Sequence, residues 1–399
     1  MQKATLCTST AVLAAAMFAA SAIMPARASS IDDEHYRLAV ESISKGIEYL
    51  REQQNEDGSW SPEVGPAITA LAVTVMLDQP NIGKDDPAVQ KGIEYILSTV
   101  RDDGGIYSER TLPVYNTAIS LSALSRVRGD PRVAEAIQKG EKYLRSLQYT
   151  GDREDPHGDR ITEDHPYRGG FGYGRHGRPD GSNTQIAAQA FRDLGVDCED
   201  PAFVELVRYT SRLQGIPENE MFGDQIVNDG GAIYATSLDS DHIGVPESRA
   251  SPEAREIIED GGEYTQPLQT YGSMTYAMFK TYIYAELDRD DVRVRSAYEW
   301  VRRNFTVEHN PGNPEDIKYN GYYYYLMTMG RALAAWGMEV RDTDGEVIHW
   351  RRELTRELVE RQEEDGSWVN MADRYMEGNP ELVTCYALIA LNNAIGREP

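Results

Sequence analysis

Apolar residues recur every three to four positions in six segments of the chain that otherwise carry many charged side chains. In the first segment, Ile43, Ile47, Leu50 and Gln54 follow the spacing i, i+4, i+7 and i+11. This spacing places them on one stripe of an α-helix, which faces a neighbour. Related stretches predict amphipathic helices at residues 45–54, 91–100, 139–148, 205–214, 297–305 and 353–362. Several follow Asp-Pro or Asp-Asp, which suits a helix start.

A second set of six segments alternates with the first and is apolar on most sides. These segments begin at Pro66, Tyr115, Ser182, Tyr271, Gly321 and Glu381. Helices of this kind are buried on most of their surface. Each outer and inner pair leaves apolar surface uncovered, so the pairs must stack. An open solenoid is one solution, but the more apolar inner set favours a closed ring. The pattern therefore predicts an all-α fold, an (α/α)6 toroid of six helical hairpins.

Two amphipathic segments end in nearly the same letters, about 300 residues apart. Residues 45–60 read KGIEYLREQQNEDGSW, and residues 353–368 read ELTRELVERQEEDGSW. The shared ending predicts the turn at which an outer helix stops and leads into an inner one. We expect Trp60 and Trp368 to hold this turn by packing. We expect Gln54 and Gln362 to bond exposed backbone at the end of a neighbouring helix.

These endings resemble the QW motif of squalene–hopene and oxidosqualene cyclases, which recurs in looser form in protein prenyltransferase β-subunits. The matching residues are Lys45, Gly46, Tyr49, Leu50, Gln54, Gly58 and Trp60, and then Gln362, Gly366 and Trp368. The resemblance covers about residues 35–395. It implies the toroid fold and little chemistry, because the motif residues brace helices. Stretches such as RPDGSNTQ and GYYYYLMTMGRAL resemble a group of exported bacterial proteins with prenyltransferase/squalene-oxidase-type repeats, which implies no activity.

Residues 1–28 have the pattern of a secretory signal peptide. Lys3 supplies a positive charge, residues 11–20 form a short apolar run, and Ala26-Arg27-Ala28 fits a cleavage site. The run is shorter than the roughly 20 residues of a membrane-spanning helix, and no other stretch predicts a span. We therefore expect residues 29–399 to form a single exported domain, located in the periplasm or secreted.

The chain is strongly acidic, with 40 basic and 65 acidic residues and a net charge of −25. Loss of Lys3 and Arg27 with the signal makes this −27. Such a surface repels phosphate backbones, which argues against nucleic acid as a partner. Cys198 and Cys385 remain in the mature chain and can form at most one disulfide, so the protein is not a disulfide scaffold.

The catalytic motifs of the resembling families are incomplete. Class II terpene cyclases protonate an alkene with the middle acid of Asp-x-Asp-Asp, which requires a strong acid in a dry cavity. The nearest match is Asp239-Ser240-Asp241-His242. Asp241 is therefore a candidate acid, and a solvated acidic loop is the alternative.

Protein prenyltransferases hold zinc with an Asp-x-Cys pair and a His on inner helices, and this set is missing from the sequence. We therefore predict no cofactor and no resident metal. Potential ligands are densest in one long loop, where His157 and His165 accompany Asp155, Asp159 and Asp164. An acidic surface loop is the simpler interpretation of this group.

The resemblance implies that ligands meet the N-terminal ends of the inner helices, which here are rich in Tyr, Asn and Gln. A Tyr-lined cavity suits a ligand with apolar faces and hydroxyl groups. About half of these tyrosines are expected to face helix packing, because adjacent helical positions are 100° apart. The candidate ligand-binding residues are Tyr115, Asn116, Asn183, Gln185, Tyr271, Tyr276, Tyr319 and Tyr322.

Asp180 precedes the stretch Gly-Ser-Asn-Thr-Gln and has two interpretations. Asp at such a position commonly caps a helix. It is also the best-placed carboxylate for the cavity, and together with Asp241 it makes up the candidate catalytic residues.

Three functions fit these patterns. The first is a cavity protein that binds or transforms an apolar, lipid-like or isoprenoid-like ligand. The second is a carbohydrate-active enzyme similar to a polysaccharide lyase, for which Arg168, Arg175 and Arg178 near Asp180 would supply part of the site. The third is a non-catalytic ring that presents its loops to a protein partner. The sequence leaves open whether any reaction follows binding.

Overall fold

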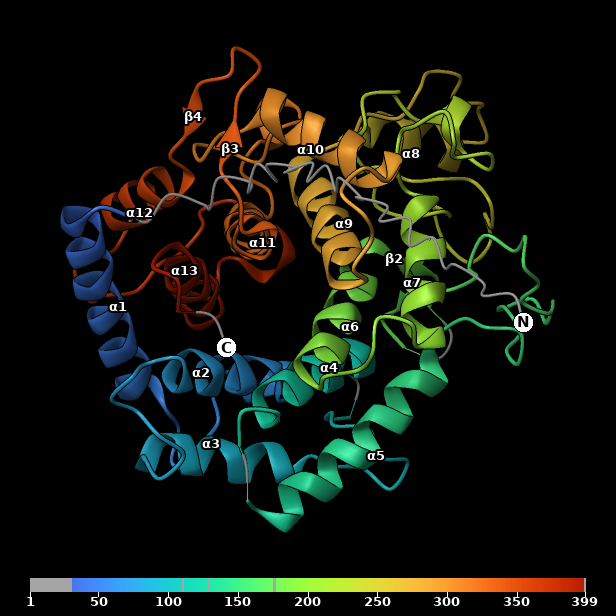
Figure 1. The fold of residues 1–399 in the computed structure, drawn as a ribbon. Coiled ribbons are helices and arrows are strands. Elements are labelled where there is room, and N and C mark those ends of the chain that lie inside the picture. The colour runs from blue at the N-terminus through green and yellow to red at the C-terminus, as the bar shows by residue number, and fades with distance from the viewer. Residues whose placement is uncertain (1–30, 110, 128, 175–176, 398–399) are drawn as a thin grey trace, which may run out of the picture.

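The computed structural model describes residues 31–109, 111–127, 129–174 and 177–397. In this part of the chain, twelve helices alternate between the outside and the inside of one ring (Figure 1). The outer helices are α1 (Asp33–Gln53), α3 (Pro87–Ser98), α5 (Pro131–Leu147), α7 (Pro201–Ser211), α10 (Val292–Asn304) and α12 (Trp350–Glu360). The inner helices are α2 (Ala67–Leu77), α4 (Pro113–Leu124), α6 (Gly181–Asp193), α9 (Gly272–Tyr284), α11 (Tyr322–Trp336) and α13 (Pro380–Ala394).

The ring is closed by contact between its first and last inner helices. Each inner helix packs against the next one along the chain, from α2 through α4, α6, α9 and α11 to α13. Helix α13 then packs against α2, and α1 packs against both α12 and α13. The predicted (α/α)6 toroid is confirmed, and the open solenoid is excluded.

The outer helices begin where the Asp-Pro pattern predicts. The carboxylates of Asp86, Asp130 and Asp200 accept hydrogen bonds from the backbone N–H groups two residues further on. A proline occupies the first position of each of these three helices, where its missing N–H is no loss. The inner helices are buried almost throughout, and in α13 residues 382–394 are all buried.

The turn between an outer and an inner helix is held by the residues that the repeated ending predicts. The Gln54 Nε2 atom donates to the carbonyl oxygens of Gly58, at 3.1 Å, and of Ala88 in the next outer helix, at 2.9 Å. The indole N–H of Trp60 donates to the Leu50 carbonyl, at 2.7 Å. These contacts tie the end of α1 to the start of α3.

At the second copy, Gln362 bonds the carbonyls of Gly366 and Ser42, both at 2.9 Å. The prediction of a helix end is wrong here, because α1 begins at Asp33 and Ser42 lies within it. Gln148 and Gln214 make the same pair of bonds at their own turns. The hydrogen bonds of this turn therefore recur at positions where the sequence matches the motif only in part.

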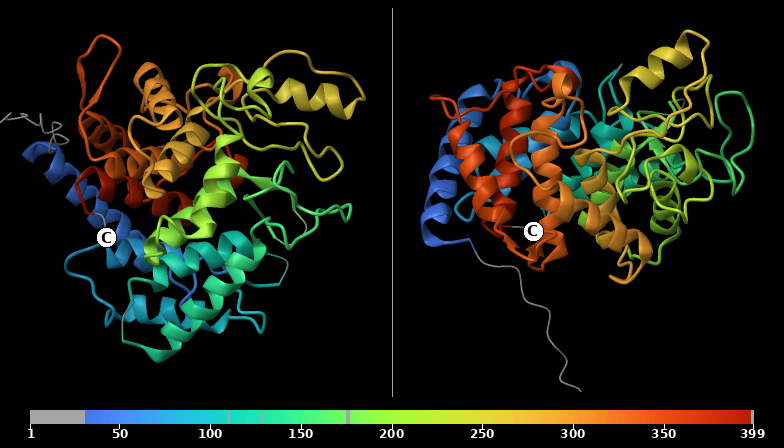
Figure 2. Two further views of the ribbon diagram at one scale, coloured as in Figure 1. Left: turned by 45° about the vertical axis from the view of Figure 1, so that its right-hand side comes forward. Right: turned by 90° about the horizontal axis from the view of Figure 1, so that it is seen from above.

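Segments outside the ring include one further helix, α8 (Pro252–Glu259), which belongs to a long insertion between α7 and α9. Figure 2 shows α8, in yellow, projecting beyond the ring. Two short antiparallel pairs join β1 (Phe171–Gly172) to β2 (Pro179–Asp180) and β3 (Val340–Arg341) to β4 (Val347–Ile348). Short 3-10 turns lie at Pro62–Val64, Gly223–Gln225, Glu315–Ile317 and Arg374–Met376.

The predicted signal peptide, residues 1–28, lies outside the described residues. Within the described part of the chain, no helix combines the length and the apolar character needed to cross a bilayer.

Candidate ligand cavity

A cavity of about 300 Å³ lies at the N-terminal ends of the inner helices. This volume is at the lower end of the range for small-molecule sites. The first turns of all six inner helices contribute to its lining through Ala67, Tyr115, Ser182, Ser273, Tyr324 and Leu382. The cavity is therefore at the end of the ring where the resemblance places ligands.

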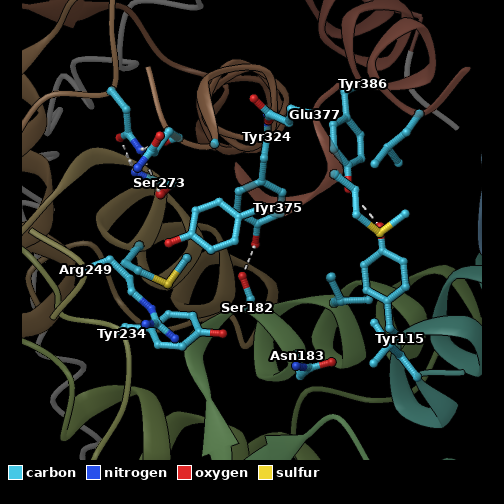
Figure 3. A pocket seen from close by; sticks show the side chains of 18 of the residues that line it. Tyr115, Ser182, Asn183, Tyr234, Arg249, Ser273, Tyr324, Tyr375, Glu377 and Tyr386 are labelled. Atoms are coloured by element: carbon cyan, nitrogen blue, oxygen red, sulfur yellow. Dashed lines mark hydrogen bonds between the residues drawn. The ribbon is translucent and has the colours of Figure 1, made fainter. Parts of the chain in front are cut away.

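Loops between the helices complete the wall of the cavity. Tyr173 follows β1, and Tyr234 and Arg249 belong to the insertion before α9. Tyr375 and Glu377 come from the loop before α13. Figure 3 shows Tyr375 lying across the cavity toward Arg249, with Glu377 near the start of α11. The lining thus combines aromatic rings from several parts of the chain with one guanidinium and one carboxyl group among the described residues.

Tyr324 places a phenolic hydroxyl in the cavity, and two side chains of α6 hold this hydroxyl in position. Its oxygen accepts a hydrogen bond from Ser182 Oγ, at 3.0 Å (Figure 3). It accepts another from Gln185 Nε2, also on α6, at 2.7 Å. Burial raises the pKa of Tyr324, so the hydroxyl keeps its proton at physiological pH. Because the oxygen acts as an acceptor in both bonds, its proton is left for a ligand.

Two tyrosine pairs add further hydroxyl groups. The hydroxyl oxygens of Tyr115 and Tyr386 are 2.8 Å apart, and those of Tyr173 and Tyr234 are 3.2 Å apart. Each pair shares one proton in its hydrogen bond and retains a second. Burial raises the pKa of Tyr115 to about 12, so this hydroxyl remains a neutral donor at physiological pH.

Glu377 is the carboxyl group of the lining and also caps α11. It is 1% exposed, and it accepts hydrogen bonds from the backbone N–H of Tyr324 at 2.7 Å and from Asn370 Nδ2 at 2.6 Å. Burial raises the pKa of Glu377 to about 7, although these donors favour the charged form. The group therefore exchanges its proton near neutral pH, where a general acid or base is most effective.

Arg249 provides the positive charge of the lining. Its Nη1 atom is 2.7 Å from the Glu247 carboxylate, and its guanidinium lies over the Tyr234 ring, 4.7 Å from the ring centre. Glu247 is almost fully buried and also pairs with Arg178 and Arg255. Three guanidinium groups thus share one buried carboxylate beside the cavity.

The loop that carries Tyr375 has a strained backbone. Tyr375 and Met376 adopt φ angles of 64° and 66°, in the left-handed region that disfavours residues with a Cβ atom. Both side chains line the cavity, and they are 47% and 40% exposed. The strain is therefore located at the mouth of the cavity.

The structure brings some of the predicted residues to the cavity. Tyr115, Asn183 and Tyr271 line it, and Gln185 lies behind Tyr324. The Asn183 Oδ1 atom is buried without a hydrogen-bond partner among the described residues. Asp180 caps α6 by accepting from the backbone N–H of Asn183, at 2.8 Å, so the cap interpretation is confirmed.

Asp180 lies behind the lining rather than in it. Its side chain is 1% exposed and accepts a second bond, at 2.8 Å, from Asn183 Nδ2. Burial raises the pKa of Asp180, while Arg178 and these bonds act in the opposite direction. In this structure Asp180 orients Asn183 toward its place in the wall.

The other predicted residues lie away from the cavity lining. Asn116 bonds the backbone at the start of α2, with its Oδ1 atom 2.8 Å from the Ala67 nitrogen. Tyr276 packs against Tyr325 in the core, with ring centres 5.7 Å apart. The hydroxyl of Tyr322 lies 2.8 Å from Glu357, on the outer side of α11.

Tyr319 and Asp241 are also outside the lining. Tyr319 is 38% exposed and packs edge-on against Tyr322. Asp241 is an exposed loop residue, which matches the solvated-loop alternative. In the long acidic loop, His165 Nε2 is 3.3 Å from Asp155, which also accepts from the backbone N–H of His157. Within the described ranges, no three His, Cys, Asp or Glu residues are grouped so that they could hold a metal.

Sequence reasoning missed Tyr234 and Arg249, because nothing in a loop sequence indicates which side chains turn toward a distant helix end. It also passed over Tyr324 in favour of Tyr322. The sequence held no signal for Tyr324, because helical periodicity shows which tyrosines share a face and not which face turns to the ring centre.

The comparisons with known proteins support the fold. A D-mannose isomerase matches with a TM-score of 0.57 at 11% identity, over 92% of this chain and 100% of that chain. A protein from Actinoplanes matches with a TM-score of 0.51 at 15% identity, over 89% and 99% of the two chains. A type II terpene cyclase from Scytonema matches at 14% identity over 92% and 100%, with a TM-score of only 0.37. No family model and no curated protein sequence matches.

The protein is therefore an all-α toroid, and its fold is similar to that of a D-mannose isomerase. At these identities the likeness concerns the fold alone, and the function has to be argued from the cavity.

Proposed function

We propose that this protein is exported and binds a small amphipathic molecule, isoprenoid-like in its apolar part, in the tyrosine-lined cavity. The observation that carries the proposal is a wall that offers apolar surface together with phenolic protons that the protein itself does not use. Aromatic residues with a polar tip suit ligands that have an apolar body and a few hydrogen-bonding groups.

Four inner helices supply apolar side chains to the wall. Ile68 and Ile186 come from α2 and α6, Met274 from α9 and Leu382 from α13. Burying apolar ligand surface there yields roughly 25 cal/mol per Å². The resemblance to the QW-repeat families supports an isoprenoid-like body, and the modest cavity volume favours a short one.

The carbohydrate alternative has less support. Glycoside hydrolysis commonly uses two carboxyl groups on either side of the bond, whereas Glu377 is the one carboxyl group in the described lining. For a lyase-like site, Arg168 is paired with Glu205 at 2.6 Å, and Arg178 with Glu247. Arg175 lies outside the described residues.

The first test is native mass spectrometry of the mature protein purified from its own envelope or culture fluid, followed by organic extraction. The proposal expects a bound mass in the range of a short isoprenoid or similar amphiphile. Titration calorimetry with geraniol, a ten-carbon isoprenoid alcohol, provides a defined probe.

Two variants locate the binding site. Ile186→Trp fills the cavity and is expected to abolish geraniol binding. Tyr324→Phe removes a hydroxyl that the probe can bond, and is expected to weaken binding about tenfold, the usual effect of losing one well-placed hydrogen bond. Tyr319→Phe is the matched control, because this tyrosine is outside the lining. A bound sugar, or a protein partner with no small molecule, would contradict the proposal in favour of the corresponding alternative.

A further inference from the structure

The guanidinium of Arg249 is only partly used by the protein. Among the described residues, its hydrogen-bonding and ionic contacts go to Glu247, through Nη1. The Nε atom is shielded from solvent and has no partner. In a planar guanidinium, Nε and Nη2 form one edge, and this edge fits the two oxygens of a carboxylate. Because Nε is shielded from solvent, a ligand reaches both donors of this edge only after a small turn of the Arg249 side chain. Nothing in the described chain occupies the edge.

Several charged groups surround Arg249. Arg178, Arg249 and Arg255 all pair with the Glu247 carboxylate, and the buried Asp180 carboxyl interacts with Arg178 and Arg249. Arg255 has a second partner, Glu259, on the surface at 2.7 Å. Arg178 also donates to the Leu238 carbonyl, at 2.8 Å. Arg249 is therefore the member of the group that lines the cavity, and its Nε–Nη2 edge has no partner among the described residues.

The guanidinium in this wall contrasts with the molecule as a whole, whose net charge is −25. The Arg249 side chain is 25% exposed and lies beside aromatic rings in a mostly apolar lining. A guanidinium in such surroundings favours one specific ionic partner.

Resting on the proposed function, we infer that the ligand carries a carboxylate group that binds the free edge of Arg249, with its apolar body directed across the cavity toward α13. A monocarboxylic acid with an apolar body is the class that fits. The carboxylate would lie between Arg249 and the side chain of Tyr375, which Figure 3 shows directed toward Arg249. A phosphate, with up to two negative charges, fits less well. Only one guanidinium edge would contact it, and the Glu247 carboxylate on the other side of Arg249 would repel its second charge.

The experiment compares two probes that share their apolar body. Geranic acid and geraniol have the same ten-carbon skeleton and differ in the head group, which is a carboxylate in one and a hydroxyl in the other at pH 7.5. Calorimetric titration of the full mature protein is expected to show geranic acid binding at least tenfold tighter, which corresponds to about 1.4 kcal/mol. The preference should shrink as the salt concentration rises.

Arg249→Gln removes the charge and is expected to bind the two probes with equal affinity. Arg255→Gln is the matched control, because it removes a guanidinium from the same carboxylate outside the lining, and it should keep the preference. If Arg249→Gln does not fold, the two probes in the unmodified protein still test the carboxylate assignment. Arg249→Lys, which keeps the charge and loses the two-donor edge, then tests the role of Arg249 and is expected to reduce the preference for the acid.

The outcomes separate the two proposals. Equal affinity of the unmodified protein for acid and alcohol overturns the carboxylate assignment and leaves the proposed function in place. Binding of neither probe overturns the proposed function and this inference with it. A preference for the acid that survives in Arg249→Gln overturns the role of Arg249.

Discussion

Glu377 should make the stability of the protein depend on pH in a defined window. Burial raises the pKa of this carboxyl group from 4.5 in the unfolded chain to about 7 in the folded protein. Between these values the folded protein keeps a proton that the unfolded chain releases. Stability is then lost as pH rises, because the folded state binds more protons. The contribution is complete below pH 4.5 and is gone above about pH 7.

The size of the effect follows from the shift in the pKa of Glu377. At 1.36 kcal/mol for each pH unit, a rise from 4.5 to about 7 corresponds to about 3 kcal/mol of unfolding free energy. The side chain is 1% exposed, so water screens the effect very little. Asn370 and the first turn of α11 donate to the carboxylate and limit the shift without reversing it.

The assay is urea unfolding of the unmodified protein and of Glu377→Gln at intervals between pH 4 and pH 8. Gln keeps the shape of the side chain and cannot titrate. The difference between the two unfolding free energies should therefore change by about 3 kcal/mol between pH 4.5 and 7, because the unmodified protein becomes less stable relative to Glu377→Gln as pH rises. The exposed Glu364→Gln serves as the control for general charge effects. A difference that stays constant across this window would refute the reasoning.

Two further predictions concern the ring. Gly58→Ala should lower the unfolding free energy, measured by urea unfolding, by about 2 kcal/mol or more. The φ angle of Gly58 is 91°, and an added Cβ would lie 2.3 Å from the Lys91 carbonyl oxygen. Gly83 has open space around it, so the control Gly83→Ala should leave the unfolding free energy unchanged. Lys280→Met should raise the melting temperature at pH 7. Burial lowers the pKa of Lys280 well below its usual value, and among the described residues its amine donates a hydrogen bond only to Gln189 Oε1, at 3.0 Å. An unchanged or lower melting temperature for Lys280→Met would show that this amine is better accommodated than its burial implies.

The helical repeat was predictable because its signals are local. The Asp86 cap acts on an N–H group two residues away, and the Gln54 turn contact to Gly58 spans four residues. The single apolar stripe of α1 predicts an outer helix, and the apolar residues on most sides of α13 predict an inner one. Only the length of α1 misled the prediction, since its extra N-terminal turns moved the partner of Gln362 from a helix end into the helix.

The cavity residues were only partly predictable. The sequence indicated the end of the ring and the abundance of tyrosine, and it named Tyr115, Asn183 and Tyr271. It chose Tyr322 where the structure turns Tyr324 inward, because a run of four tyrosines carries no information on the rotation of the helix about its axis.

The sequence by itself determined the alternation of helices, their caps and the turns between them, because these depend on contacts within a few residues or on one helical face. The tertiary structure alone decided which side chains meet in the cavity. Arg249 and Glu377 come from loops 128 residues apart in number, and they face one space because α11 packs between α9 and α13, the inner helices that follow these loops. Burial in that closed ring, rather than any motif, moves the pKa of Glu377 toward neutrality.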